Sequence, residues 1–418
     1  MPTAEAADAR HDRDTGPGFV TDGRELVRSN AAAVPSLFAA RLVEWRAERI
    51  SDPVERLRFL RKTAPYATLP GKRLYRILVI LSSVLLMGGF ALPPIIRSFR
   101  SLQGSPVAVL LRPGAAPAAD RVADVWQVER KPDYEIYSNG LRVETQGAVF
   151  EQARKYAIAP RQDAGNWSRP RLADLRIATS PAGIVYHTTE SHIAPFRSAE
   201  IQSLQRAGRG VLAYVRQARA YHYLIDRFGR VHRVVDEASV ANHAGWSVWA
   251  DSRNLYLALN YSFLGVSFEA QTRPQDGSET INPAQVRAGQ MITEMLRSKY
   301  KIAAANCVTH AQVSVNPDNF LVGAHTDWAT RFPFAALGLP DNYATPLPSI
   351  SLFGFQYDNT YVAMSEAGLW KGLLLGSEEV RLAATARGLR APVYRALLNH
   401  RYTELMELMQ KKRTEDGN

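Results

Sequence analysis

The sequence predicts an α/β fold, with α+β as the alternative, because strand patterns and helix patterns alternate through its middle. An apolar run at 183–187 ends on a histidine, and two alternating runs at 220–236 flank a turn signal. A further apolar strand at 264–271 precedes a helix pattern that Asn282 can cap and Pro283 can begin. We expect this domain to follow one transmembrane helix and to precede a small helical C-terminal region.

The N-terminal segment, residues 1–72, begins with about 30 polar and charged residues that are typical of disorder. The next landmark is an uncharged apolar run at 77–96, which would reach roughly 30 Å as a helix, the thickness of a bilayer core. A buried core helix would normally carry a polar face, and a cleaved signal peptide would lie nearer the start of the chain. We therefore expect a transmembrane helix over 74–96.

Basic residues are unevenly distributed around this run. Three follow it within twenty residues, whereas six precede it, namely Arg58, Arg61, Lys62, Lys72, Arg73 and Arg76. Because positive charge favours the cytoplasmic side, we expect the N-terminal segment inside and everything after Arg97 outside.

Four segments follow the span. We expect a Pro/Ala/Gly-rich linker over 97–124 and a strand-rich lead-in over 125–170, with a hairpin turn at the Ser-Asn-Gly of 138–140. The main domain is predicted over 171–350. The remainder, 351–418, has a helical pattern between Ser365 and Met409.

The composition limits the class of protein, its partners and the kinds of metal site that can form. The 418 residues are 46% hydrophobic and 22% charged, which suits a globular protein, and the net charge of +11 suits an anionic partner such as a lipid surface or an acidic wall polymer. A nucleic acid is not indicated, because the basic residues are scattered and no binding motif is present. With Cys307 as the single cysteine, no intramolecular disulfide and no cysteine-rich zinc site can form. Any metal would rest on histidine and carboxylate.

Histidines concentrate in the main domain. Seven of the nine lie between 187 and 325, and they are His187, His192, His222, His232, His243, His310 and His325. His187 closes an apolar strand, and His325 follows the apolar stretch at 320–323. A neutral imidazole at a strand end is a well-directed zinc ligand, although a lone histidine is more often structural.

Five segments, in order, resemble the zinc-dependent N-acetylmuramoyl-L-alanine amidases of type 2, the superfamily of phage-lysozyme-type amidases and peptidoglycan recognition proteins. They are IVYHTTE at 184–190, AYHYLIDRFGRVHRVVDE at 220–237, SVANHAGWS at 239–247, LGVSFEA at 264–270 and VGAHTDWA at 322–329. The resemblance implies a central mixed sheet flanked by helices. It also implies a Zn²⁺ ion held by two histidines and a third His, Cys or Asp, with water in the fourth position.

The implied activity is hydrolysis of the amide bond between the muramoyl sugar and L-alanine in peptidoglycan, with peptidoglycan or muropeptides as substrate. Together with the predicted span, it implies a single-pass protein of the bacterial cytoplasmic membrane with a periplasmic catalytic domain. The sequence indicates no protein partner. The alternative is a non-catalytic recognition protein on the same fold.

The resemblance identifies two of the expected zinc ligands but not the third. His187 matches the first ligand and His325 the second, but Pro333 and Ala335 stand where the family places a Cys or Asp. His310 is either the third ligand or, in a shifted register, the second with Asp318 after it. The predicted set is His187, His310 and His325. Asp327 would then orient an imidazole, or bind the metal if His310 does not.

Catalytic candidates follow from the same resemblance. Tyr221 stands where phage-type relatives carry a catalytic tyrosine, and Ser267 replaces the general-base glutamate of the muropeptide amidases. Glu269, two residues along the strand, points to the same face and is the predicted carboxylate. Arg331 is a weaker candidate near the oxyanion. The predicted substrate-binding residues are His222, His243 and Trp246, whose indole suits apolar stem or sugar surface.

Overall fold

The computed structural model describes residues 122–162, 167–274 and 279–415. The transmembrane helix predicted over 74–96, the N-terminal segment and most of the linker lie outside these ranges. Within them, no helix combines the length and apolar character that a membrane span requires.

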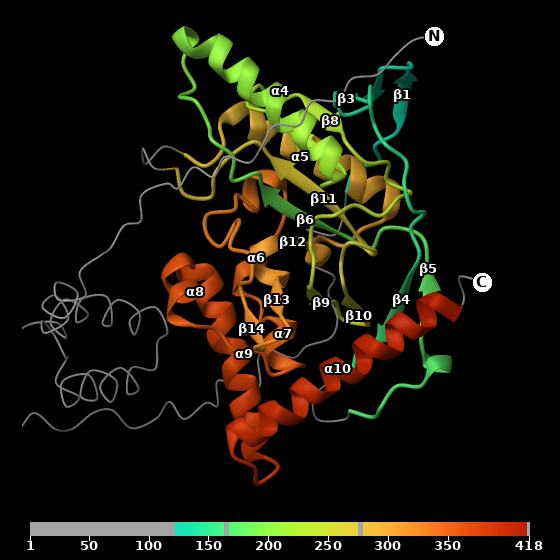
Figure 1. Ribbon diagram of the computed structural model, residues 1–418, viewed down its shortest axis with the longest axis vertical. Helices are drawn as coiled ribbons and strands as arrows, with labels where there is room; N and C mark the ends of the chain where they lie inside the picture. Colours follow the sequence, from blue (N-terminus) through green and yellow to red (C-terminus); the bar gives the residue numbers. More distant parts are fainter. Residues whose placement is uncertain (1–121, 163–166, 275–278, 416–418) are drawn as a thin grey trace, which may run out of the picture. The chain divides into compact units, whose positions relative to one another are not determined.

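An eight-stranded mixed sheet forms the centre of the domain, in the order β1-β2-β3-β8-β7-β11-β6-β12 (Figure 1). Its strands are β1 (Gln127–Arg130), β2 (Tyr134–Tyr137), β3 (Arg142–Glu144), β6 (Gly183–Thr188), β7 (Tyr223–Ile225), β8 (Val231–Arg233), β11 (Phe263–Phe268) and β12 (Cys307–Thr309). The predicted central sheet is confirmed. The lead-in strands join it directly, since β3 pairs with β8 in parallel.

The middle strands β6 and β11 are buried at every position and run parallel to each other. Such continuous apolar runs form strands that are covered on both faces. Strand β12 extends the parallel set beyond β6, whereas β7 and β8 form the predicted antiparallel hairpin, with its turn at Asp226–Arg230. The carboxyl ends of β6, β11 and β12 therefore meet at one edge of the sheet.

Two long helices cover the sheet, α4 (Ile201–Ala218) on one face and α5 (Pro283–Tyr300) on the other (Figure 1). Val215 of α4 packs in a cluster with Leu224 of β7. On the other face, the hydroxyl of Tyr186 in β6 lies 2.7 Å from that of Thr293 in α5. Helix α5 begins as predicted, with the Asn282 side chain accepting a hydrogen bond from Gln285 N.

A four-stranded antiparallel sheet has the order β5-β4-β10-β9. Its strands are β4 (Tyr156–Pro160), β5 (Arg176–Ala178), β9 (Val248–Ala250) and β10 (Asn254–Leu257). A separate hairpin pairs β13 (Val315–Asn316) with β14 (Leu321–Val322). This hairpin lies between two segments that contribute to the site described below.

The C-terminal part is helical, as its pattern predicts. The short helices are α6 (His310–Val313), α7 (Pro348–Ser351) and α8 (Asn359–Met364), and the long ones are α9 (Ala367–Thr385) and α10 (Ala391–Glu415). Helix α9 packs on α7, and α10 crosses β4 of the smaller sheet (Figure 1). The C-terminal helices thus pack against the domain itself.

Candidate metal centre

Strand register brings two histidines together at the carboxyl edge of the sheet. In the parallel pair β6–β12, Thr309 stands opposite Tyr186, so that the next residue of each segment is His310 and His187. Their ring centroids are 4.5 Å apart. His310 begins α6 directly after β12, and this short turn directs its ring back toward β6. The pairing of β6 with β12 therefore brings the two histidines together.

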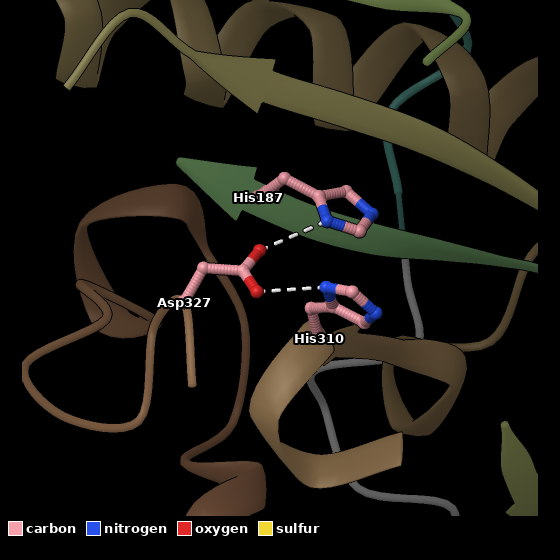
Figure 2. Close-up of side chains that lie close together, drawn as sticks. All are labelled: His187, His310 and Asp327. Atoms are coloured by element: carbon pink, nitrogen blue, oxygen red, sulfur yellow. Dashed lines mark hydrogen bonds and ion pairs between the residues drawn. The ribbon is translucent and has the colours of Figure 1, made fainter. Parts of the chain in front are cut away.

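Asp327 completes a three-residue group with these histidines (Figure 2). One carboxylate oxygen lies 3.0 Å from Nδ1 of His187, and the other lies 2.7 Å from Nδ1 of His310. The loop that carries Asp327 is fixed on both sides. The backbone carbonyl of Asp327 accepts a hydrogen bond from Ala311 N. The following residue, Trp328, is fully buried and donates its backbone N–H to Thr272 Oγ1.

The group is buried and electrostatically coupled. Burial and, after it, the neighbouring His310 lower the pKa of His187 to about 4, against the opposing effect of Asp327. Burial would raise the pKa of Asp327, but the charge of His310 and hydrogen bonds with both histidines outweigh it and hold that pKa well below the usual range. At neutral pH the site therefore presents a neutral His187 and an ionised carboxylate, the forms that bind metals.

The three residues that the structure brings together differ in one member from the predicted ligand set. His187 and His310 belong to the group, whereas His325 is exposed and stacks on His310, with ring centroids 4.7 Å apart. Asp318, the carboxylate of the alternative register, lies exposed in the turn of the β13–β14 hairpin. Asp327, predicted to orient an imidazole or to bind the metal in place of His310, is the third member of the group.

Tyr221 lies beside the group. Its ring centroid is 4.9 Å from that of His187, and its backbone has a φ of 65°, which a non-glycine residue adopts at an energetic cost. This conformation follows the end of α4, where the chain reverses into β7. The structure thus brings Tyr221 together with the predicted first ligand.

Glu269 lies immediately after β11, and it is 1% exposed. One of its carboxylate oxygens accepts a hydrogen bond from Arg227 N at 3.1 Å, and the carboxylate packs against Gly208 of α4. Burial raises the pKa of Glu269 to about 7, although the Arg227 hydrogen bond acts in the opposite direction. The interactions described for Glu269 are with the β7–β8 turn and α4 rather than with the three-residue group.

The raised pKa predicts a pH-dependent stability. Because the folded value of about 7 exceeds the ordinary 4.5, Glu269 stabilises the fold below pH 4.5 and loses that contribution as the pH rises through 7. Glu269→Gln should therefore raise the free energy of unfolding by up to about 3 kcal/mol at pH 8 and change it little at pH 4. Urea denaturation at both pH values measures this difference. The exposed Glu407→Gln is the control, and equal effects of E269Q at both pH values would refute the expectation.

Arg331 lies apart from the histidines. Its side chain is 71% exposed and forms an ion pair with Glu366, with 3.0 Å between Nη2 and Oε1. Within the described residues, this ion pair is the interaction that positions the guanidinium. The structure does not bring Arg331 to the three-residue group.

The predicted substrate-binding residues separate into two buried histidines and one exposed tryptophan. His222 is fully buried, and its Nδ1 accepts a hydrogen bond from Gly265 N, so that the ring links two strands rather than facing a groove. His243 is 8% exposed and contacts His187. Trp246 is 55% exposed and lines a pocket of about 300 Å³ together with Arg413 and other residues of α10.

The donor set fits zinc. Two imidazole nitrogens and one carboxylate oxygen lie within 4.8 Å of one another, and two histidines with one carboxylate are a ligand set typical of catalytic zinc sites. Three protein ligands leave a coordination position for water or substrate. The residues present therefore fit the ion that the resemblance implies.

Sequence spacing predicted Asp327 as an orienting group, or as a ligand in place of His310, and not as a partner of both His187 and His310. Asp327 follows His310 by 17 positions, rather than the eight or ten expected, because the β13–β14 hairpin lies between them. The available signal was the Asp-Trp pair at 327–328, since a large apolar residue next to a carboxylate fixes the carboxylate at the edge of the core.

One family model matches part of this chain. Residues 178–329 match the family model for N-acetylmuramoyl-L-alanine amidases, a range that contains His187, His310 and Asp327. No curated protein matches the chain.

Several solved structures are similar. The Pseudomonas aeruginosa AmpDh3 complex with anhydromuramic pentapeptide is 22% identical, with a TM-score of 0.27, over 38% of this chain and 58% of that one. The endolysin amidase LysCS from Clostridium intestinale is 23% identical, with a TM-score of 0.24, over 38% and 81%. AmiD from E. coli, bound to its substrate anhydro-N-acetylmuramic acid-L-Ala-D-gamma-Glu-L-Lys, is 17% identical, with a TM-score of 0.30, over 59% and 97%.

The matched segment contributes β6, β7, β8, β11 and β12 of the central sheet and all of the three-residue group. Residues 178–329 of this chain thus form a segment that matches the model of the N-acetylmuramoyl-L-alanine amidase family.

Proposed function

We propose that this protein is a zinc-dependent amidase that hydrolyses the bond between the muramoyl lactyl group and L-alanine in peptidoglycan. The observation that carries the proposal is the convergence of His187, His310 and Asp327 at the carboxyl edge of the sheet. AmpDh3 and AmiD, described in complex with anhydromuropeptides, support the substrate class.

His187, His310 and Asp327 would hold the ion. When bound, zinc polarises the amide carbonyl and makes water a nucleophile at neutral pH. The protein supplies the rest of the site. The ionised Asp327 contributes the negative charge that a dication requires, and the buried walls keep competing water away from both imidazoles.

Tyr221 is the proposed hydrogen-bond donor to the oxyanion that develops on the amide carbonyl. A phenol is protonated at neutral pH, and burial raises the pKa of Tyr221 further. A donor beside a developing negative charge stabilises the transition state more than the ground state. Glu269 and Arg331 remain predicted participants, with Glu269 as the general base, and Trp246 is proposed to contact the stem or sugar surface.

Tyr221→Phe should lower kcat about 100-fold and leave zinc content unchanged, because it removes one donor and keeps the ring beside His187. Steady-state hydrolysis of a muropeptide, together with metal analysis, measures both quantities. Tyr214→Phe, at an exposed position of α4, is the control. A fully active Y221F protein would remove Tyr221 from the mechanism.

The proposed function is tested with purified protein and peptidoglycan. Mass spectrometry should detect stem peptides with a free L-alanine amine, and a chelator should stop their release until zinc is restored. A protein that binds peptidoglycan and releases no peptide would instead be a recognition protein, the alternative function on this fold.

We also propose that the protein is anchored in the bacterial cytoplasmic membrane by the apolar run at 77–96, with the amidase domain on the periplasmic side. The proposal is supported by the length of this run and the excess of basic residues before it. Protease added to spheroplasts should digest the amidase domain. Protection of the domain in intact spheroplasts, with digestion after lysis, would overturn this orientation.

A further inference from the structure

The second ring nitrogen of His187 belongs to a chain of contacts that ends on the backbone. Nε2 of His187 lies 3.2 Å from Nδ1 of His243, and Nε2 of His243 lies 3.2 Å from the carbonyl oxygen of Phe263. Both rings are buried, at 1% and 8% exposure. The family match and the metal geometry assign no role to His243.

The carbonyl at the end of the chain determines where the protons lie. A carbonyl oxygen can only accept, so Nε2 of His243 must carry a hydrogen and donate it to Phe263. In the neutral ring, Nδ1 of His243 is then an acceptor. Nε2 of His187 must therefore be the donor in the contact between the two rings.

This proton order leaves Nδ1 of the neutral His187 with a lone pair. That lone pair faces a carboxylate oxygen of Asp327 at 3.0 Å. A metal ion between the lone pair and the carboxylate oxygen would be bound by both. The hydrogen-bond chain thus makes the Asp327 side of His187 a cation site.

We infer that His243 is a positioning residue that keeps the proton of His187 on Nε2 and so directs the Nδ1 lone pair toward the metal. The inference deepens the proposed function and rests on the metal site proposed there. It reassigns His243, because the residue predicted to contact substrate acts instead through a metal ligand. Partners of this kind fix the orientation and tautomer of metal-binding histidines.

The surroundings of His243 hold its ring in place. The Asn260 side chain accepts hydrogen bonds from the backbone N–H groups of His243 and Ala244, at 2.9 and 2.6 Å. Gly265 of β11 lies directly against the ring, where a Cβ atom would come within 2.7 Å of Cγ of His243. The absence of a side chain at Gly265 is therefore what lets the imidazole reach both Phe263 and His187.

Two substitutions separate the hydrogen bond from the shape of the ring. His243→Phe fills the same space and removes the acceptor, whereas His243→Asn places an amide oxygen near the former Nδ1. Zinc affinity, measured by competition with a chromophoric chelator, should fall 10–100-fold in H243F. H243N should stay within about threefold of the original protein, since the acceptor is retained. His232→Asn on β8 is the matched control. Equal zinc affinities for H243F and the original protein would overturn the inference.

The proton order is also measurable without metal or substrate. Nitrogen NMR of the metal-free, histidine-labelled protein should show a hydrogen on Nε2 of both His187 and His243. A neutral His187 that carries its single hydrogen on Nδ1 would overturn the inference even if H243F did not fold. Because these measurements need no hydrolysis, an inactive protein with the expected proton order refutes the proposed function alone. An active protein with the opposite order refutes the inference alone.

Discussion

His187→Ala should abolish peptide release from peptidoglycan and lower zinc affinity by more than about 100-fold, since loss of an outer partner alone costs 10–100-fold. His187 is the residue through which the site is assembled. Its Nδ1 lies 3.0 Å from Asp327, its ring lies 4.5 Å from that of His310, and Tyr221 packs beside it. Zinc content by atomic absorption and stem-peptide release by mass spectrometry measure the two losses.

The control for this substitution is His232→Ala, since His232 lies on β8 and its ring contacts Asp226 rather than the metal group. That variant should retain zinc and activity. Circular dichroism should show both variants folded, because the apolar residues that surround β6 are unchanged. An H187A protein with normal peptide release would remove the metal model of this site.

Asp327→Ala should lose zinc and activity to a similar extent, whereas His325→Ala should keep zinc affinity within about threefold. The structure places Asp327 between both histidines, and the exposed His325 stacks on the outer side of His310. Removing Asp327 also removes the only carboxylate of the three-residue group, so that a bound dication would lack a negative charge among its ligands.

The same pair of variants decides between the sequence-based ligand set and the geometric one. If H325A loses zinc and D327A retains it, the predicted set of His187, His310 and His325 is correct. Isothermal titration with zinc at pH 7 resolves the two results, and Asp318→Ala, in the exposed hairpin turn, is the control carboxylate.

Glu269 shows what a strand pattern can predict about a side chain and what it cannot. Alternation along β11 predicts a side chain on the same face as Ser267. The pattern does not reveal that α4 crosses this face at Gly208 and that the β7–β8 turn supplies a backbone donor. Those contacts come from residues about 40 to 60 positions earlier in the chain, and they, rather than the strand, determine the surroundings of the carboxylate.

The sequence by itself determined the strand that ends on His187, the strand at 264–271, the two hairpins of the central sheet and the cap of α5. Each of these follows from short-range backbone preferences and from apolar residues repeating at the period of a strand or helix. The pairing of β6 with β12, however, was not readable from either strand alone.

Only the tertiary structure decided which carboxylate lies beside His187 and His310. Burial of Trp328 and its hydrogen bond to Thr272 draw Asp327 to the histidines, across a hairpin that lengthens the spacing beyond the family pattern. The carbonyl of Phe263 likewise decides the role of His243. Both arrangements depend on contacts between segments that lie far apart in the chain. The local periodicity of apolar residues does not indicate which polar residues such contacts will bring together.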